Sequence, residues 1–485
     1  MVFSSHLFVY YFLPLALVIY YLLPRAGRHL GLTVLSYLFY GWANPAFMLL
    51  MLFSTTVDYL CGLAMTGGLR RGLREPLPRL EPGGERSRGQ RLAVTVSIVT
   101  NLGLLACFKY FNFAVDSYNA LLAALGMADL QLDSVLRIAL PLGISFYTFQ
   151  SMSYSIDVYR GDARALRNPI DFACYVSMFP QLVAGPIIRF SEIDDQLRSR
   201  RHTLEKFARG VAFFSLGMAK KVLLANPCGK VADTVFDAGS AFTFDAWYGV
   251  FAYAMQIYFD FSGYTDMAIG LGLMLGFVFP KNFDSPYKSA SITEFWQRWH
   301  VSLSTWLRDY LYIPLGGNRR GRRRTYVNLA LVMLLGGLWH GAAWTFVLWG
   351  GFHGALLALE RMRGKTGLFD GLPRFAMVGG TFLLVLVSWV FFRAADLGHA
   401  LGYLGAMAGV GSPQDGAVLV SGVIYQPYYL LIVGTAAGIA FAAPQTWDWT
   451  RRLPAWKAVL SLGALWLALA ALTTQEYNPF IYFIF

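Results

Sequence analysis

Long apolar runs, separated by short polar loops, recur along nearly the whole chain. The clearest of them span residues 7–23, 30–40, 47–65, 92–108, 113–125, 138–156, 210–225, 246–279, 327–340, 344–359, 375–392, 423–443 and 458–472. A helix needs about 20 apolar residues to cross a bilayer, and several of these runs are shorter. Because a broken helix persists at membrane depth only where protein or a water-filled cavity covers its backbone, the pattern predicts about ten to twelve spans plus re-entrant or interfacial helices.

The composition places this apolar surface in lipid. Of the 485 residues, 56% are hydrophobic and 14% are charged, whereas a soluble domain carries about 25% charged residues. So much apolar surface exceeds what one water-soluble core can bury, and no long polar stretch separates the runs. We therefore expect an all-α polytopic integral membrane protein in which residues 1–485 form a single membrane domain.

Basic residues gather in the loops between the runs, as is typical of loops that stay in the cytoplasm. One loop, residues 70–91, holds Arg70, Arg71, Arg74, Arg79, Arg86, Arg88 and Arg91, and further clusters lie at residues 198–201, 319–324, 361–365 and 451–452. On this pattern both termini are extracytoplasmic, and the polar loop 70–91 is expected to be mobile. The clusters either set the topology alone or also dock an acidic cytoplasmic donor. Because they carry no aromatic platforms, the net charge of +12 gives no support to nucleic-acid binding.

Two aspartates lie inside the apolar stretch YFDFSGYTDMAIG, at Asp260 and Asp266. Ionisable side chains inside a membrane are costly and usually face a cavity or a partner. Gly263 between them suits a break in the helix. The two carboxylates either take part in chemistry or pair with an arginine and only hold the fold together.

The segment of residues 291–318 is too polar for a simple span. Glu294 and Arg298 are four residues apart and can pair on one helix face. Trp296, Trp299 and Trp306 suit a bilayer interface, so the segment predicts an interfacial or re-entrant helix that lines a path into the protein. The alternative is an amphipathic surface helix in which His300 is a hydrogen-bonded core residue.

His340 ends an apolar run and is flanked by Trp339 and Gly341. Gly336, Gly337 and Gly341 allow backbone or substrate to approach closely. A neutral imidazole here can accept a proton from a hydroxyl group and return it to a leaving thiolate, as acyl transfer from a thioester to an alcohol requires. Alternatively, His340 bridges helices. His353 falls on another face of a continuous helix, which favours a structural role.

Several common catalytic motifs are absent from the sequence. Residues 143–147 read GISFY and lack the final glycine of a GxSxG elbow, and neither a P-loop nor an HExxH motif occurs. The cysteines have no metal-ligand spacing, so no metal site is expected; they are Cys61, Cys107, Cys174 and Cys228. The sequence therefore does not support a serine hydrolase, an ATP-driven pump or a zinc protease.

Three long segments carry a family resemblance. They read YFDFSGYTDMAIGLGLMLGF, SITEFWQRWHVSLSTWLRDYLYIPLGGNRRG and LLGGLWHGAAWTFVLWGGFHG. Together with MVFSSHLFVYYFLPL, PLGISFYTFQSMSYSIDVYRG, FPQLVAGPIIRF and PFIYFIF, they resemble the bacterial branch of the membrane-bound O-acyltransferases from the first residues to the last. The resemblance implies a ring of membrane helices around a thinned centre with a tunnel.

The resemblance also implies roles for individual residues. His340 matches the essential histidine of the family's WHG motif, and His300 matches its second signature histidine. Residues expected to line the tunnel or support the substrate are Asp260, Asp266, Trp299, Arg308, Asp309, Asn318 and Trp339.

The implied function is acetyl transfer in a bacterial inner membrane. Acetyl-CoA, as a donor and not a bound cofactor, would supply the group from the cytoplasm. Periplasmic acetyltransferase partners would place it on a polysaccharide such as alginate. The rival functions are D-alanyl transfer to teichoic acid from a carrier protein, transport of an acyl donor without bond chemistry, and a scaffold for periplasmic acetylases.

Overall fold

The computed structural model describes residues 1–481, apart from residues 43, 71–74, 133–135, 240, 365, 411–416 and 476. These residues form helices and no strand, which confirms the predicted all-α class. The chain divides into two compact units, Met1–Thr203 with Leu275–Phe279 and Leu204–Met274 with Pro280–Phe485. The single membrane domain stays a prediction. Three residues of the predicted basic clusters lie outside the described residues: Arg71, Arg74 and Lys365.

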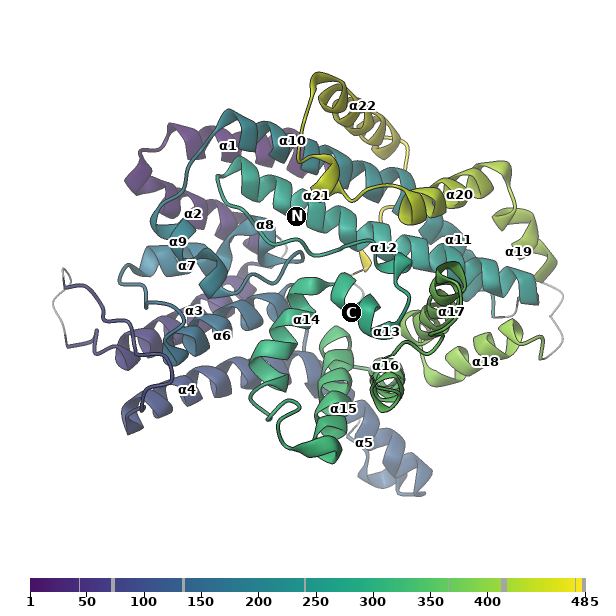
Figure 1. The fold of residues 1–485 in the computed structure, drawn as a ribbon, viewed down its shortest axis with the longest axis horizontal. Helices are drawn as coiled ribbons and strands as arrows, with labels where there is room; N and C mark the ends of the chain where they lie inside the picture. Colours follow the sequence, from purple (N-terminus) through teal and green to yellow (C-terminus); the bar gives the residue numbers. More distant parts are fainter. Residues whose placement is uncertain are drawn as a thin grey trace. The chain divides into compact units, whose positions relative to one another are not determined.

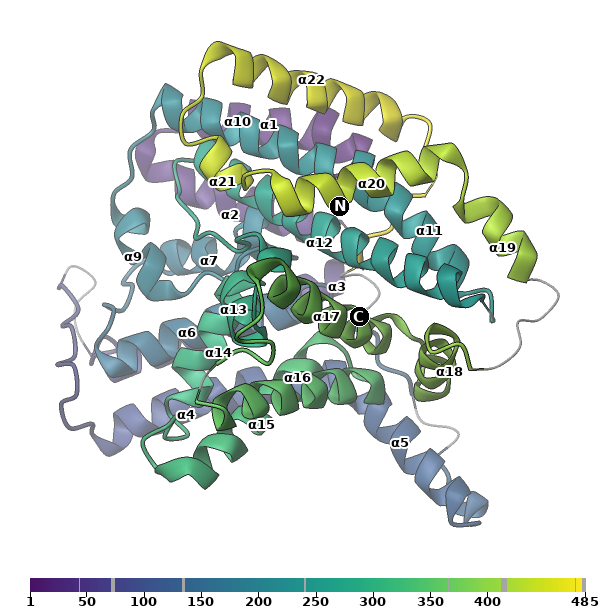
Figure 2. The ribbon, with the colours of Figure 1, turned by 45° about the vertical axis from the view of Figure 1, so that its right-hand side comes forward.

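Both units are built from short and long helices, which can be followed by colour in Figures 1 and 2. The first unit contains η1 (Leu7–Phe12), α1 (Leu13–Leu22), η2 (Arg25–Gly27), α2 (Arg28–Gly41), α3 (Pro45–Met65), α4 (Arg88–Leu105), η3 (Ala106–Tyr110), α5 (Phe111–Ala124), η4 (Ala128–Leu130), α6 (Ile144–Arg160), α7 (Pro169–Ser177), α8 (Phe179–Leu182) and α9 (Phe190–Arg198). The second contains α10 (Leu204–Ala219), η5 (Lys220–Ala225), α11 (Asn226–Phe236), α12 (Thr243–Met274), η6 (Pro286–Lys288), α13 (Ile292–Arg298), α14 (Val301–Leu307), η7 (Arg308–Tyr312), α15 (Gly321–His340), α16 (Trp344–Met362), α17 (Arg374–Arg393), α18 (Leu397–Met407), α19 (Ala417–Ile424), α20 (Pro427–Ala442), α21 (Thr446–Trp449) and α22 (Ala455–Leu472).

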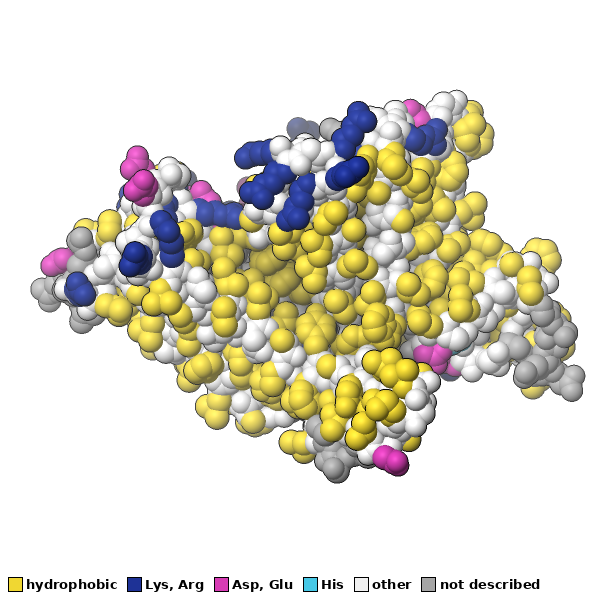
Figure 3. Space-filling view, turned by 90° about the horizontal axis from the view of Figure 1, so that it is seen from below, with side chains coloured by type: hydrophobic (Ala, Val, Ile, Leu, Met, Phe, Trp, Pro, Cys, Tyr) yellow, Lys and Arg dark blue, Asp and Glu magenta, His cyan; other side chains and the backbone are white. Residues whose placement is uncertain are grey.

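Among the described residues, four helical segments are long and apolar enough to cross a membrane: Pro45–Met65, Arg88–Ala124, Arg374–Arg393 and Ala455–Leu472. The pair α19 and α20, bent by 67°, makes a possible fifth. Hydrophobic side chains cover most of the face in Figure 3, as expected for a protein whose surface meets lipid. The protein is thus a multi-pass membrane protein, whereas the number of ten to twelve spans stays a prediction.

One predicted boundary between apolar runs is not a break. Helices α4 and α5 join through the π-helical turn η3, so residues 88–124 form one helical segment. The segment ACFKY at this turn contains neither glycine nor proline, the residues that usually interrupt a helix. Lys109 in the turn is buried, and its Nζ donates to Ser145 Oγ of α6 at 3.3 Å.

The loop of residues 70–91 is tied to the end of α6 by two of its arginines. Arg86 Nε donates to the Tyr159 carbonyl at 2.6 Å, and Arg79 Nε donates to the Gly161 carbonyl at 2.8 Å. The last carbonyls of a helix lack partners within the helix and carry partial negative charge, so guanidinium groups suit them. These bonds hold the two arginines against the end of α6, and the expected mobility of the loop stays a prediction.

A buried carboxylate joins α3, α4 and α6 in the first unit. Asp58 accepts hydrogen bonds from Ser97 Oγ at 2.5 Å, Asn101 Nδ2 at 2.7 Å and Ser151 Oγ. All four side chains are inaccessible to solvent. Because an unpaired buried charge is very costly, these three donors stabilise the packing of the three helices.

Helices α10 and α12 of the second unit approach each other at glycines. A Cβ at Gly217 would lie 2.5 Å from the Gly263 carbonyl oxygen, and one at Gly210 would lie 2.6 Å from that of Gly270. Each helix therefore presents its backbone to the other at two points seven residues apart. The expected break at Gly263 is wrong, because α12 is one continuous helix of 32 residues. The absence of a side chain at Gly263 lets α10 pack closely against it.

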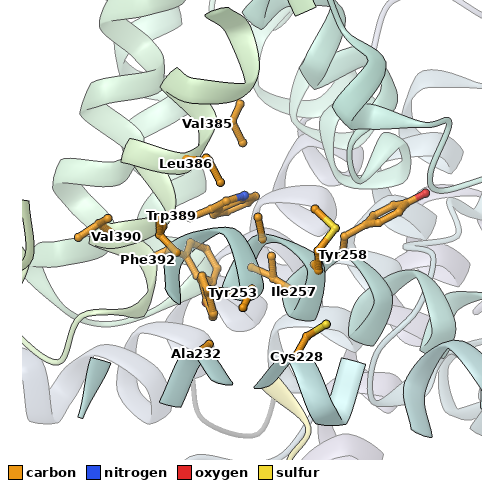
Figure 4. Packing of buried hydrophobic residues seen from close by; sticks show 14 of the residues in the cluster. Cys228, Ala232, Tyr253, Ile257, Tyr258, Val385, Leu386, Trp389, Val390 and Phe392 are labelled. Atoms are coloured by element: carbon orange, nitrogen blue, oxygen red, sulfur yellow. The ribbon is translucent and has the colours of Figure 1, made fainter. Parts of the chain in front are cut away.

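A large apolar core lies beneath the site described below. Tyr253 and Ile257 of α12 lie near Trp389 and Phe392 of α17, and Tyr258 of the same core points away from them, as Figure 4 shows. Cys228 and Ala232 of α11 close the core from the other side of α12. Because such cores are packed about as densely as organic crystals, they fix the position of α17 and of the rings that α17 carries.

We expect Gly263→Ala to lower the melting temperature of the purified protein in detergent. The added Cβ would lie 2.8 Å from the Gly217 carbonyl oxygen, and such overpacking costs about 1–3 kcal/mol. Gly434→Ala in α20 is the matched control, because a Cβ there meets nothing within 4 Å. Alanine favours a helix over glycine, so the control should be neutral or slightly stabilising. Equal melting temperatures for the two variants would contradict the close approach of α10 and α12.

Candidate active site

Helices α15 and α16 form a tight antiparallel hairpin that ends α15 at His340. A Cβ at Gly337 would collide with the Phe346 carbonyl oxygen, and one at Gly350 would collide with the Met333 carbonyl oxygen. Glycine at these positions lets the two backbones meet directly. The extended residue Gly341 then stops α15, so the imidazole of His340 stands at the end of a rigid helix.

Aromatic rings surround His340, which is only 5% exposed. The centroid of its ring lies 5.0 Å from that of Trp339, 5.2 Å from Trp349 and 5.3 Å from Phe392. All three contacts are edge-to-face, an arrangement that fills space while leaving the ring orientation fixed. Phe392 belongs to α17, so the apolar core sets one wall of the site.

His300 separates α13 from α14 and lies close to His340. The two ring centroids are 6.4 Å apart, and His300 is fully buried. Its backbone has φ +44° and ψ +56°, which is a left-handed conformation. Among the described non-glycine residues, only Ser285 also has a positive φ. A strained buried residue at such a point is typical of a functional site. The segment is thus two short helices broken at His300 rather than one continuous helix, and its re-entrant position in a membrane stays a prediction.

A cavity of about 410 Å³ opens beside His340 within the second unit. It is lined by α13, α14, η7, α15 and α16, and its lining is largely apolar. Leu329, Met333, Gly336 and His340 line it from one face of α15, over about 16 Å of helix. Its basic residues are Arg308 and Arg361, and Arg361 stands 12 residues beyond Trp349 on α16, about 18 Å along the axis. The cavity can therefore hold a long apolar chain with an anionic end.

Asp260 and Asp266 do not line this cavity. Asp260 pairs with Lys221 at 2.7 Å, and Asp266 pairs with Lys220 at 2.6 Å. Both lysines belong to the π-helical turn η5. Asp260 also accepts the Ile481 N–H at 2.8 Å, which fastens the C-terminal segment. The arrangement favours the structural alternative for the two aspartates, with lysine in place of the expected arginine.

The other predicted residues lie in different surroundings. Trp339 contacts both histidines, and Arg308 lines the cavity while pairing with Asp309 at 2.6 Å. Trp299 is buried among aromatic rings and lies 5.0 Å from Trp389. Asn318 is exposed in a turn. These residues stay candidates, and only some of them are brought together at the histidines.

Two further predictions about side chains can be compared with the structure. The Glu294–Arg298 pair is confirmed at 2.8 Å. His353 is buried and accepts a hydrogen bond from Trp296 Nε1 at 3.3 Å, in agreement with the expected structural role.

Sequence reasoning missed Trp349, Asn282 and the role of Arg361 in the cavity. Arg361 was included in a basic cluster, and its position one residue before the end of α16 could have indicated it. Asn282 hydrogen-bonds to His300 from 18 residues away, with no motif linking the two.

The chain is similar to known proteins over its whole length. The family model described as MBOAT, membrane-bound O-acyltransferase family, matches residues 95–366. The chain is 45% identical to a probable alginate O-acetylase AlgI of Pseudomonas putida over the whole of both chains. It is 49% identical to a probable alginate O-acetylase AlgI of Azotobacter vinelandii, over 85% of this chain and 79% of that one. A peptidoglycan O-acetyltransferase of Helicobacter pylori is 35% identical over 84% and 80%.

We expect Asp260→Ala to destabilise the protein strongly. The substitution leaves the Lys221 ammonium, which is 3% exposed, without its carboxylate, and breaking a buried ion pair costs about 3–5 kcal/mol. The double variant Lys221→Met/Asp260→Leu removes both charges and should recover most of the lost stability. Melting temperatures in detergent test this. A stable Asp260→Ala protein without activity would instead give Asp260 a chemical role.

Proposed function

Since the chain belongs to the membrane-bound O-acyltransferase family and is an integral-membrane acyltransferase, we propose that it transfers an acetyl group from acetyl-CoA toward a polysaccharide outside the cytoplasm. The observation that carries the proposal is the position of His340, which stands at the end of a rigid helix and faces a cavity large enough for an acyl thioester. The relatives with substantial coverage are named as acetyl-transferring proteins, which favours acetyl over other acyl groups.

His340 acts as the general base. It takes the proton from the acceptor hydroxyl as the hydroxyl oxygen bonds to the acetyl carbon, and it returns that proton to the thiolate when the carbon–sulfur bond breaks. No proton is consumed overall. The aromatic wall of Trp339, Trp349 and Phe392 keeps bulk water from the ring, which limits hydrolysis of the thioester.

The donor lies in the cavity with its acetyl end at His340 and its phosphates toward Arg361 and Arg308. Coenzyme A is a polyanion on a flexible arm, and a guanidinium can bind phosphate through two parallel hydrogen bonds. The apolar lining of α14 and α15 suits the arm between them. From the basic loops we infer that this end of the cavity faces the cytoplasm, where acetyl-CoA is available, and that both termini lie outside.

The acceptor side follows from the relatives. Alginate and peptidoglycan in their names are polysaccharide-containing polymers that lie outside the cytoplasmic membrane, so we infer a bacterial inner-membrane location and periplasmic acetyltransferase partners. His300, Trp299, Trp339, Asp309 and Asn318 remain candidates to support the substrate, and Asp260 and Asp266 hold the helices. D-alanyl transfer predicts use of a carrier-protein thioester instead of acetyl-CoA, and a transporter predicts donor movement without cleavage.

His340→Ala should lower acetyl transfer by about 10²–10⁴-fold, the usual contribution of a general base. The assay follows loss of labelled acetyl groups from acetyl-CoA by purified protein in lipid vesicles, with candidate acceptors added. His399→Ala in α18 is the control histidine and should match the wild type. Cleavage that is equal in wild type and His340→Ala would exclude the proposed base, and labelled donor that crosses the vesicle uncleaved would establish transport.

Arg361→Ala should raise the KM for acetyl-CoA by about tenfold or more with little change in kcat, because a charge-assisted hydrogen bond contributes about 1.5–3 kcal/mol. Arg363→Ala is the matched control, since Arg363 bonds the Leu368 carbonyl and does not line the cavity. Steady-state kinetics at two salt concentrations make the comparison. An unchanged KM in Arg361→Ala would place the phosphates elsewhere.

A further inference from the structure

His300 carries two energetic costs at once. Its left-handed backbone is disfavoured for a residue with a Cβ. Its Nε2 is buried and has no hydrogen-bond partner among the described residues, so its desolvation is not compensated by a bond within the protein. Folded proteins rarely keep an unsatisfied buried polar atom without a reason. The surrounding structure must therefore hold His300 in place, and the residue that bonds to it is a candidate for a role at the site.

Asn282 holds His300 from the segment that follows α12. Its side-chain Oδ1 lies 3.1 Å from His300 Nδ1, 3.1 Å from the Ser302 backbone nitrogen and 2.8 Å from Ser302 Oγ. Its backbone carbonyl accepts the Val301 N–H at 2.9 Å, and its Nδ2 donates to Thr265 Oγ1 at 3.3 Å. Asn282 is 1% exposed, and it does not line the donor cavity.

The direction of the Asn282 amide follows from the backbone of Ser302. A backbone N–H can only donate, so the amide atom that faces it must be the oxygen. That same oxygen faces His300 Nδ1, which must then carry the hydrogen. A neutral imidazole has one N–H and one lone pair, so Nε2 holds the lone pair. The backbone N–H of Ser302, which can only donate, thus fixes the orientation of the Asn282 amide and, through it, the tautomer of His300.

We propose that Asn282 is a positioning residue that fixes His300 as its Nδ1–H tautomer and keeps Nε2 as a ready hydrogen-bond acceptor for the reaction at His340. The proposal rests on the proposed function. The ring of His300 lies 6.4 Å from that of His340, next to the base. A tautomer set by a neighbouring acceptor is how proteins direct one imidazole nitrogen toward chemistry.

The charged groups around this pair are already matched. His340 is the titratable side chain beside His300, and Phe261 and Trp339 are its other ring neighbours. Asp266, one residue after Thr265, is paired with Lys220, and Asp284 is paired with Lys281 at 2.7 Å. The effect of Asn282 on His300 is therefore not masked by an unpaired charge among these groups.

Asn282→Ala removes the acceptor and should lower kcat by about 10²-fold, within the range for residues that orient a functional histidine, with the KM for acetyl-CoA unchanged. Asn226→Ala is the matched control for loss of a buried amide, since Asn226 bonds Gln475 and Asn478 instead. A kcat of Asn282→Ala within about threefold of the wild type would overturn the proposal.

Asn282→Asp keeps an oxygen in the same place and should retain most of kcat. Its carboxylate stabilises protonated His300, so the acid limb of the pH–rate profile should move to higher pH by about one unit. The Asn282→Asp variant tests the positioning role of Asn282 even if Asn282→Ala does not fold. An Asn282→Asp protein that melts like the wild type but is as slow as His340→Ala, or has an unshifted acid limb, would overturn the proposal. Equal activities of wild type and His340→Ala would instead reject the proposed function itself.

Discussion

The contact between α15 and α16 at Gly337 and Gly350 is the constraint on which the candidate site depends. Because neither glycine has a side chain, the two backbones touch and the hairpin has little freedom to slide. This contact sets where α15 ends, and therefore where His340 stands relative to Trp349 on the facing helix. The rest of the second unit supports that geometry: α17 supplies Phe392, and the aromatic core behind α17 keeps it in place.

Several buried carboxylates and one helix end in this membrane protein are matched by specific partners. Asp260 and Asp266 have lysines, Asp58 has three donors, and the end of α6 has two arginines. Lipid offers no hydrogen bonds, so each of these groups had to be satisfied within the protein. The Nε2 of His300 has no hydrogen-bond partner among the described residues, and its ring lies next to that of the proposed base.

Some of this could be predicted from the sequence, and the reasons differ by residue. Long apolar runs gave the helices α3 and α17 almost to the residue, and the WHG motif singled out His340. The prediction that Gly263 breaks α12 is wrong. A local sequence pattern cannot distinguish a glycine that interrupts a helix from one that lets the backbone of a neighbouring helix pack against it. The lysine partners of Asp260 and Asp266, and the bond from Asn282 to His300, are contacts between separate segments. No periodicity within one segment carries that information.

The most direct test of the account is a structure of the protein with a non-cleavable thioether analogue of acetyl-CoA bound in lipid nanodiscs. We expect the analogue in the cavity lined by α13 to α16, with its acetyl carbon beside His340 and its phosphates near Arg361. An analogue bound elsewhere, with His340 still enclosed by its aromatic neighbours and the cavity empty, would contradict the assignment of this site to acyl transfer.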